Sequence, residues 1–180
     1  QRSINVPAVW LLNEIGVDEG VRFSKNIGIP LLDEDRNLAI ALGGLTEGAT
    51  PMQMAAAYSA FANEGVWSKP YAIRQIIDRD GTVVYEHTVE QKRVMEAKTA
   101  YWMTRMLEKV LERGGTGVNA RINRPVAGKT GSTQVPYEGV SQKGTNKDVW
   151  FVGYTPEWTA AIWMGYDKPD KEHYLNVSSG

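Results

Sequence analysis

The fold is organised around the stretch Val126-Ala127-Gly128-Lys129-Thr130-Gly131-Ser132-Thr133. It begins like a β-strand, and its two glycines remove side-chain bulk on either side of Lys129 and Thr130. Another backbone could therefore approach this segment closely. An extended ligand could pair along it.

Side chains alternate between the two faces of a strand, so Lys129 shares one face with Gly131, while Thr130 shares the other with Ser132. The two hydroxyl groups are therefore neighbours. A carboxylate only accepts hydrogen bonds and requires several donors. Two hydroxyls beside an ammonium group therefore predict a carboxylate-binding site.

Two other interpretations of this segment exist. A phosphate-binding P-loop also ends in Gly-Lys-Thr, but it needs a glycine five positions before Gly128 and a helix directly afterwards. Position 123 is Asn123, and Gly131 and Pro136 follow where the helix should run. The remaining interpretation is a polar edge strand with a solvated lysine, and only the context in the rest of the chain separates it from a binding site.

That context is the segment Ser3-Ile4-Asn5-Val6-Pro7 at the other end of the chain. Lys-Thr-Gly together with Ser-x-Asn resembles two of the three motifs of the penicillin-binding serine acyltransferases, whose third motif is Ser-x-x-Lys. Other stretches are similar to the transpeptidase domain of bifunctional (class A) penicillin-binding proteins: residues 3–10, 43–65, 114–117 and 148–156. The resemblance covers essentially the whole chain, in the right order.

The Ser-x-x-Lys motif itself is absent, because no serine of the chain has a lysine three residues later. In the family this motif lies upstream of Ser-x-Asn, and only Gln1 and Arg2 precede Ser3. We therefore expect residues 1–180 to form the C-terminal part of a penicillin-binding transpeptidase domain that lacks its N-terminal strands and nucleophile helix. Such a chain should be inactive alone, and its Trp158–Tyr166 strand should be an unpaired edge that favours self-association.

The resemblance implies D,D-transpeptidation in peptidoglycan synthesis. A serine of the missing part would attack the D-Ala-D-Ala amide of a stem peptide, and β-lactam antibiotics would acylate the same serine. Ser3 would relay a proton to the leaving nitrogen, Asn5 would bind the substrate amide and the missing lysine, and Lys129 would keep the Ser3 hydroxyl poised.

The same resemblance gives the Lys129 strand its substrate-binding role. Thr130 and Ser132 would bind the terminal carboxylate within the stretch that also holds Gly131 and Thr133. The backbone N–H of Ser132 would form half of an oxyanion hole.

Two alternatives remain open. Ser3 and Asn5 could instead cap a helix that follows them, the commoner role for these residue types at such a position. The whole chain could also be a non-catalytic penicillin-binding fold that binds stem peptides or protein partners.

Composition narrows the remaining functions. The chain has 180 residues, of which 42% are hydrophobic, which suits one domain with a core. Its 20 basic and 21 acidic residues give a net charge of −1 and no general attraction for nucleic acid. The chain contains no cysteine and only two distant histidines, so we expect no cofactor and no metal. No apolar run approaches the roughly 20 residues needed to cross a bilayer, so the anchor of an enzyme on the extracytoplasmic face of the bacterial membrane would lie outside this chain.

The pattern of apolar residues predicts an α+β domain, an antiparallel sheet packed with helices. Helices are expected over residues 7–15, 18–27, 50–65 and 96–113, with Asp18 capping the second and Thr50-Pro51 starting the third. Asp80-Gly81 predicts a hairpin between residues 71–77 and 82–85. Residues 148–155 and 158–166 should join the Lys129 strand as three consecutive strands, and the charged run at 33–36 should be a solvated loop.

Overall fold

The computed structural model describes residues 2–135, 137–140 and 144–177. Its α-helices are α1 (Asn5–Ile15), α2 (Val17–Asn26), α3 (Pro51–Ala62) and α4 (Ala97–Glu108), and its short 3₁₀-helices are η1 (Asp33–Asp35), η2 (Leu38–Leu42) and η3 (Val118–Ala120). Its strands are β1 (Val66–Ser68), β2 (Gln75–Ile77), β3 (Val83–Glu86), β4 (Gln91–Arg93), β5 (Ala127–Gln134), β6 (Asn146–Tyr154) and β7 (Thr159–Gly165).

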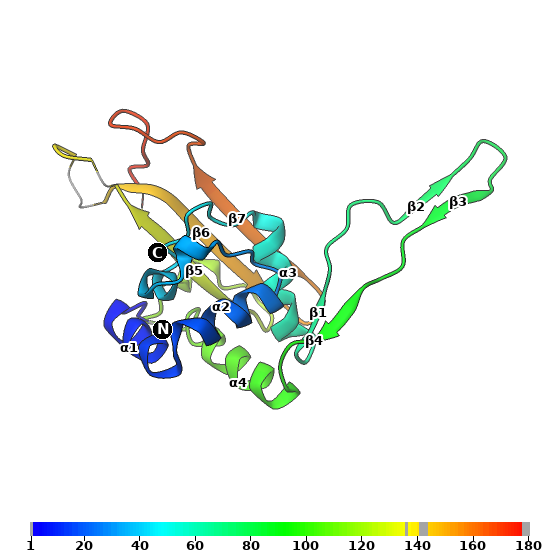
Figure 1. Cartoon of the computed structure of the whole chain (residues 1–180), viewed down its shortest axis with the longest axis horizontal. Helices are drawn as coiled ribbons and strands as arrows, with labels where there is room; N and C mark the ends of the chain where they lie inside the picture. The colour runs from blue at the N-terminus through cyan, green and yellow to red at the C-terminus, as the bar shows by residue number, and fades with distance from the viewer. Residues whose placement is uncertain (1, 136, 141–143, 178–180) are drawn as a thin grey trace.

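The central sheet has the order β5-β6-β7 with both pairs antiparallel, so the prediction of three consecutive strands is confirmed. The tight turn between β6 and β7 is held by Thr155, whose hydroxyl accepts hydrogen bonds from the N–H groups of Glu157 and Trp158. Figure 1 shows helices α1 to α4 gathered on one side of this sheet. The α+β class, an antiparallel sheet packed with helices, is likewise confirmed.

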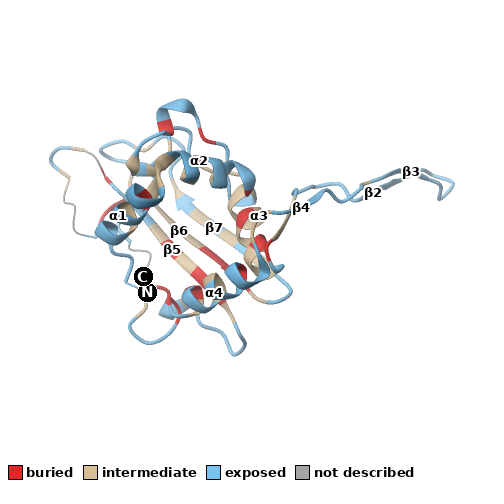
Figure 2. Cartoon of the chain, turned by 60° about the horizontal axis from the view of Figure 1, so that its bottom comes forward, coloured by how far each residue is buried: buried red, intermediate tan, exposed pale blue. Residues whose placement is uncertain are grey.

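The core lies where α3 and α4 meet the sheet (Figure 2). Tyr154 of β6 packs edge-on against Tyr58 of α3, and its hydroxyl bonds to Thr104 of α4, so both helices cover the same face of the sheet. Ala57 and Ala60 of α3 are fully buried, and their small side chains allow the helix to approach closely. Burial raises the pKa of Tyr58 to about 12, because this phenol would have to ionise away from water.

The opposite face of the sheet is much less covered. Alternation along β7 places Ile162 and Met164 on that face, and these residues are 61% and 54% exposed. The outer edge of β7 pairs with no other strand among the described residues. The predicted unpaired strand is therefore an outer strand in the described part of the chain, and self-association through it stays a prediction.

Helix boundaries differ from the predictions at several places. Helix α1 begins at Asn5, two residues before the predicted start at Pro7. The N-cap of α2 is Gly16, not Asp18, which lies in the first turn and pairs with Arg36. The predicted helix over 96–113 ends at Glu108 and continues as a turn, although Val110 and Leu111 remain buried. Helix α3 starts at Thr50-Pro51 as predicted, with Thr50 and Gln53 forming a capping box, but ends at Ala62.

The charged run at 33–36 was expected to be a solvated loop, but one of its residues is buried. Asp35 is only 3% exposed, and its carboxylate accepts hydrogen bonds from the N–H of Leu32 and from the N–H and hydroxyl of Thr46. These donors lower the pKa of Asp35, with the Thr46 hydroxyl as the largest cause. This carboxylate therefore ties η1 to the loop before α3.

Residues 69–90 form an arm that extends away from the body of the molecule (Figure 1). Its tip is the predicted hairpin, in which Ile76 of β2 pairs with Tyr85 of β3 around Asp80-Gly81. Its base is the pairing of β1 with β4, which the sequence did not predict. At that base Gly65 adopts a φ of +86°, and a Cβ there would come within 2.2 Å of the Met95 carbonyl oxygen, so only glycine fits.

Candidate active site

Ser3, near the N-terminus, lies beside Lys129 of β5. The ammonium group of Lys129 donates a hydrogen bond to the hydroxyl of Ser3 at 2.9 Å, across a separation of 126 residues. The same ammonium donates to the carbonyl oxygen of Thr130, also at 2.9 Å. The sequence-based pairing of Ser3 with Lys129 is therefore present in the structure, with the lysine held by two acceptors.

Lys129 is half-buried, and burial lowers the pKa of its ammonium group from the usual lysine value. Ser3 is exposed and has a φ of +51°, a left-handed conformation that a residue other than glycine adopts infrequently. Residues held in such conformations cluster at functional sites. A solvent-accessible hydroxyl thus faces a cation that is partly withdrawn from water.

The helix-capping alternative for Ser3 and Asn5 is not supported by the geometry. The N-cap of α1 is Ile4, and no side chain caps this helix. Asn5 is the first residue of α1 and is exposed, two positions after Ser3. Its side chain does not cap the helix, and the hydrogen bonds of the Lys129 ammonium in the described part of the chain go to Ser3 and Thr130, not to Asn5.

Thr130 makes a contact that the sequence analysis did not anticipate. Its hydroxyl lies 2.8 Å from the hydroxyl of Thr116, in the turn between α4 and η3. Thr130 is only 8% exposed, whereas Ser132 and Thr133 farther along β5 are exposed. The sequence analysis used the Gly114–Gly117 segment only as part of the family resemblance. Thr116, the one polar side chain of that segment, was the signal that could have indicated this contact.

The glycines of β5 do not open the strand to a ligand backbone in the way that was expected. A Cβ on Gly128 would come within 2.8 Å of the Phe151 ring, and one on Gly131 within 3.2 Å of the Trp150 Cβ. Both positions are small because side chains of β6 occupy the space. What remains open is the outer edge of β5, which pairs with no other strand among residues 2–135, 137–140 and 144–177.

The P-loop interpretation fails on structure. Gly128-Lys129-Thr130 lies inside β5, which continues to Gln134, whereas a P-loop lysine precedes a helix. The polar edge strand with a solvated lysine also fails, because Lys129 is half-buried and bonded to Ser3.

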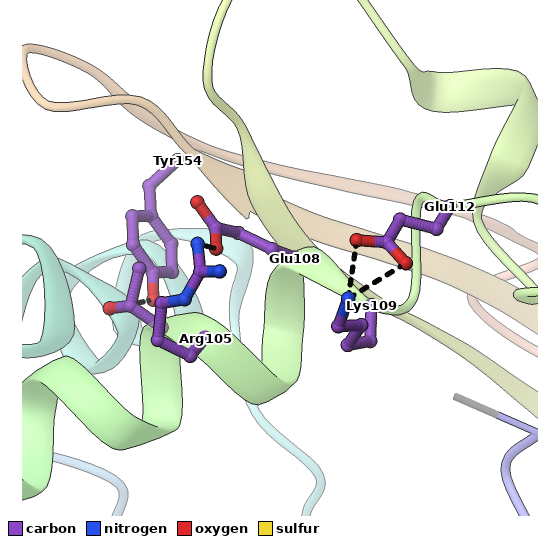
Figure 3. A network of polar contacts seen from close by, with 6 residues as sticks. Arg105, Glu108, Lys109, Glu112 and Tyr154 are labelled. Carbon is purple, nitrogen blue, oxygen red and sulfur yellow. Dashed lines mark hydrogen bonds and ion pairs between the residues drawn. The ribbon is translucent and has the colours of Figure 1, made fainter.

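A second group of polar contacts lies at the C-terminal end of α4. Figure 3 shows the ion pairs Arg105–Glu108 and Lys109–Glu112 beside Tyr154. A hollow of about 180 Å³ next to them is lined by Glu108 and Ala127 among others. Neither Ser3, Lys129 nor Thr130 lines it, so it is separate from the contact that joins the two motifs.

Comparison with known proteins agrees with this geometry. Residues 2–179 match the family model described as the penicillin-binding protein transpeptidase domain. The chain belongs to this family. Its relatives among curated proteins are class A penicillin-binding proteins, for example penicillin-binding protein 1F of Bacillus subtilis, which is 49% identical over 98% of this chain. The chain spans about a quarter (24%) of the length of that relative.

Solved structures show the same fold. Penicillin-binding protein 1A from Haemophilus influenzae superposes with a TM-score of 0.75 at 22% identity, over 92% of this chain and 29% of that one. Penicillin-binding protein 3 from Mycobacterium tuberculosis, solved in complex with ampicillin, gives a TM-score of 0.71 at 26% identity, over 90% of this chain and 42% of that one.

Proposed function

We propose that this chain supplies the proton-transfer and substrate-binding side of a D,D-transpeptidase active site that cross-links peptidoglycan stem peptides. The observation that carries the proposal is the hydrogen bond from Lys129 to Ser3, because it joins the Lys-Thr-Gly and Ser-x-Asn motifs of one family. The nucleophile is a serine of the parent protein in a Ser-x-x-Lys motif, which these 180 residues do not contain.

In this mechanism the nucleophilic serine oxygen forms a bond to the carbonyl carbon of the penultimate D-Ala. The C–N bond to the terminal D-Ala then breaks, and the proton lost by the nucleophile passes through the Ser3 hydroxyl to the departing nitrogen. An amine of a neighbouring stem peptide then bonds to the acyl carbon, the ester C–O bond to the serine breaks, and the proton lost by the amine returns to the serine oxygen, which completes the cross-link and regenerates the serine. Lys129 keeps Ser3 poised by donating to its oxygen, which leaves the Ser3 proton free to move.

The outer edge of β5 holds the substrate in this proposal. Its free edge accepts an extended peptide, and the hydroxyls of Thr130 and Ser132 donate to the terminal carboxylate. The Ser132 backbone N–H supports the oxyanion with the N–H of the nucleophile, and removal of one such donor costs roughly 3 kcal/mol of transition-state stabilisation. A β-lactam presents the same carboxylate and acylates the same serine, in keeping with the ampicillin complex of the Mycobacterium tuberculosis relative.

Within the described residues, no helix is both long and apolar enough to cross a bilayer. We place the parent protein on the extracytoplasmic face of the bacterial membrane, since its proposed substrate is cell-wall peptidoglycan.

The test is acylation of the parent protein by a fluorescent penicillin, together with release of D-Ala from a synthetic stem pentapeptide. Ser3→Ala should slow both reactions, whereas Ser68→Ala in β1, at the base of the arm, should slow neither. A parent protein that neither binds penicillin covalently nor releases D-Ala would refute the proposal and favour a non-catalytic module.

A further inference from the structure

The turn that carries Thr116 is fixed by the core of the domain. The N–H of Gly117 donates to the carbonyl oxygen of Val110 at 2.9 Å, and Val110 is 2% exposed. A Cβ on Gly115 would come within 2.1 Å of that same carbonyl oxygen, so only glycine fits beside it. Thr116 stands between these two glycines, and its position is therefore fixed by the buried turn that follows α4.

From this turn the Thr116 hydroxyl reaches the Thr130 hydroxyl at 2.8 Å. A hydroxyl has one proton to donate and two lone pairs that accept. If Thr130 gives its proton to a ligand carboxylate, its oxygen is left to accept, and Thr116 is the donor within reach. If Thr130 instead gave its proton to Thr116, it would have none for the carboxylate.

We propose that Thr116 is a positioning residue for carboxylate recognition, which donates to the Thr130 oxygen and thereby directs the Thr130 proton to the ligand. The inference rests on the proposed function, because it presumes that Thr130 binds the substrate carboxylate. It assigns the turn after α4 to the binding site: Thr116 touches no substrate and acts through Thr130. Hydrogen bonds in a chain strengthen one another, so the effect on a charged acceptor exceeds that on a neutral one.

The experiment compares benzylpenicillin with its methyl ester as acylating agents of the parent protein, in the wild type and in Thr116→Val, Thr116→Ser and Thr130→Val. The readout is the ratio of the acylation rate constants for the acid and the ester. A merely structural defect slows both ligands equally and leaves this ratio unchanged. We expect Thr116→Val to lower the ratio about threefold to tenfold, the worth of one hydrogen bond, and Thr116→Ser to keep it at the wild-type value.

The acid-to-ester ratio of the double variant Thr116→Val/Thr130→Val should be no lower than that of Thr130→Val alone. Without the Thr130 hydroxyl there is no proton for Thr116 to direct. An unchanged ratio in Thr116→Val, with a lowered ratio in Thr130→Val, overturns this inference but not the proposed function. An unchanged ratio in Thr130→Val overturns the carboxylate site itself. If Thr116→Val does not fold, Thr116→Ala takes its place with the same expectation.

Discussion

Replacement of Lys129 by alanine should separate function from stability. The substitution removes one charge-assisted hydrogen bond to Ser3 and one to the Thr130 carbonyl. A hydrogen bond to a charged group contributes about 1.5–3 kcal/mol. We take only the hydrogen bond to Ser3 to stabilise the transition state in the wild type. Because each 1.36 kcal/mol corresponds to a tenfold change in rate, its loss should slow acylation of the complete domain by about 10- to 150-fold.

The folded state should respond less. Burial lowers the pKa of the Lys129 ammonium, which means that the charged form is penalised by partial removal from water. Deletion of the side chain removes this penalty together with the hydrogen bonds. We therefore expect the free energy of unfolding to change by no more than about 1 kcal/mol, so that lost activity is not explained by unfolding.

The assay is stopped-flow acylation of the parent protein by a fluorescent penicillin, with thermal unfolding of the same samples. Lys171→Ala is the matched control, because Lys171 is exposed in the loop after β7. Equal acylation rates for the two variants would refute the reasoning and remove Lys129 from the site.

Three further predictions concern other parts of the molecule. Thr130→Val and Ser132→Ala should each weaken recognition of the ligand carboxylate by about 1.5–3 kcal/mol, measured as acylation rates of the parent protein. The unfolded wild-type chain releases the Tyr58 proton near pH 10 and the folded chain near pH 12, so the free energy of unfolding falls by about 2–3 kcal/mol as the pH rises through that window. In Tyr58→Phe this part of the decrease should be absent. The 180-residue chain alone should form no covalent penicillin adduct by intact mass, and light scattering should detect dimers or larger species formed through β7.

Each of these has a contrary outcome. If Thr130→Val slows acylation by an esterified penicillin as much as acylation by the acid, Thr130 does not bind the ligand carboxylate. Tyr101→Phe, at a residue 57% exposed, serves as the control for Tyr58, and identical alkaline curves for both variants would contradict the burial argument. A stoichiometric adduct on the 180-residue chain would show that it holds a nucleophile outside the Ser-x-x-Lys pattern, and a stable monomer would show that the β7 edge is protected.

Capping residues, turn residues and side-chain alternation correctly predicted the elements whose formation depends on neighbouring residues. Thr50-Pro51 combines a capping hydroxyl with a residue suited to the first helical turn, and α3 starts there. The three strands of the central sheet follow one another along the chain, so turn residues and alternation were enough to predict their pairing. The meeting of Ser3 with Lys129 came from family resemblance, because no pattern within either segment specifies a partner 126 residues away.

Contacts that depend on tertiary packing could not be predicted from local sequence patterns. Asp35 stands in a run of charges typical of a solvated loop, and two of the three donors that allow it to be buried come from Thr46, eleven residues later. The pairing of β1 with β4 joins two three-residue strands too short to show alternation. The predicted helix over 96–113 ends at Glu108, and the chain then turns through Gly114, at a φ of +83°, before Thr116 reaches the Thr130 hydroxyl at 2.8 Å, a contact that helix periodicity does not reveal.

The Ser3–Lys129 hydrogen bond also bears on how the chain folds. The meander β5-β6-β7 is built from neighbouring segments and closes short loops, whereas this contact must bring together residues 126 positions apart. Closure of a longer loop costs more chain entropy, so the contact is expected to form after the sheet and to break before it. Substitutions that loosen the packing of α1 on η2 would then reduce the fraction of molecules with an assembled site while the core stays folded. Covalent labelling of the parent protein by penicillin would count only the molecules in which Ser3 has reached Lys129, so for this domain it reports the completion of folding as well as chemical competence.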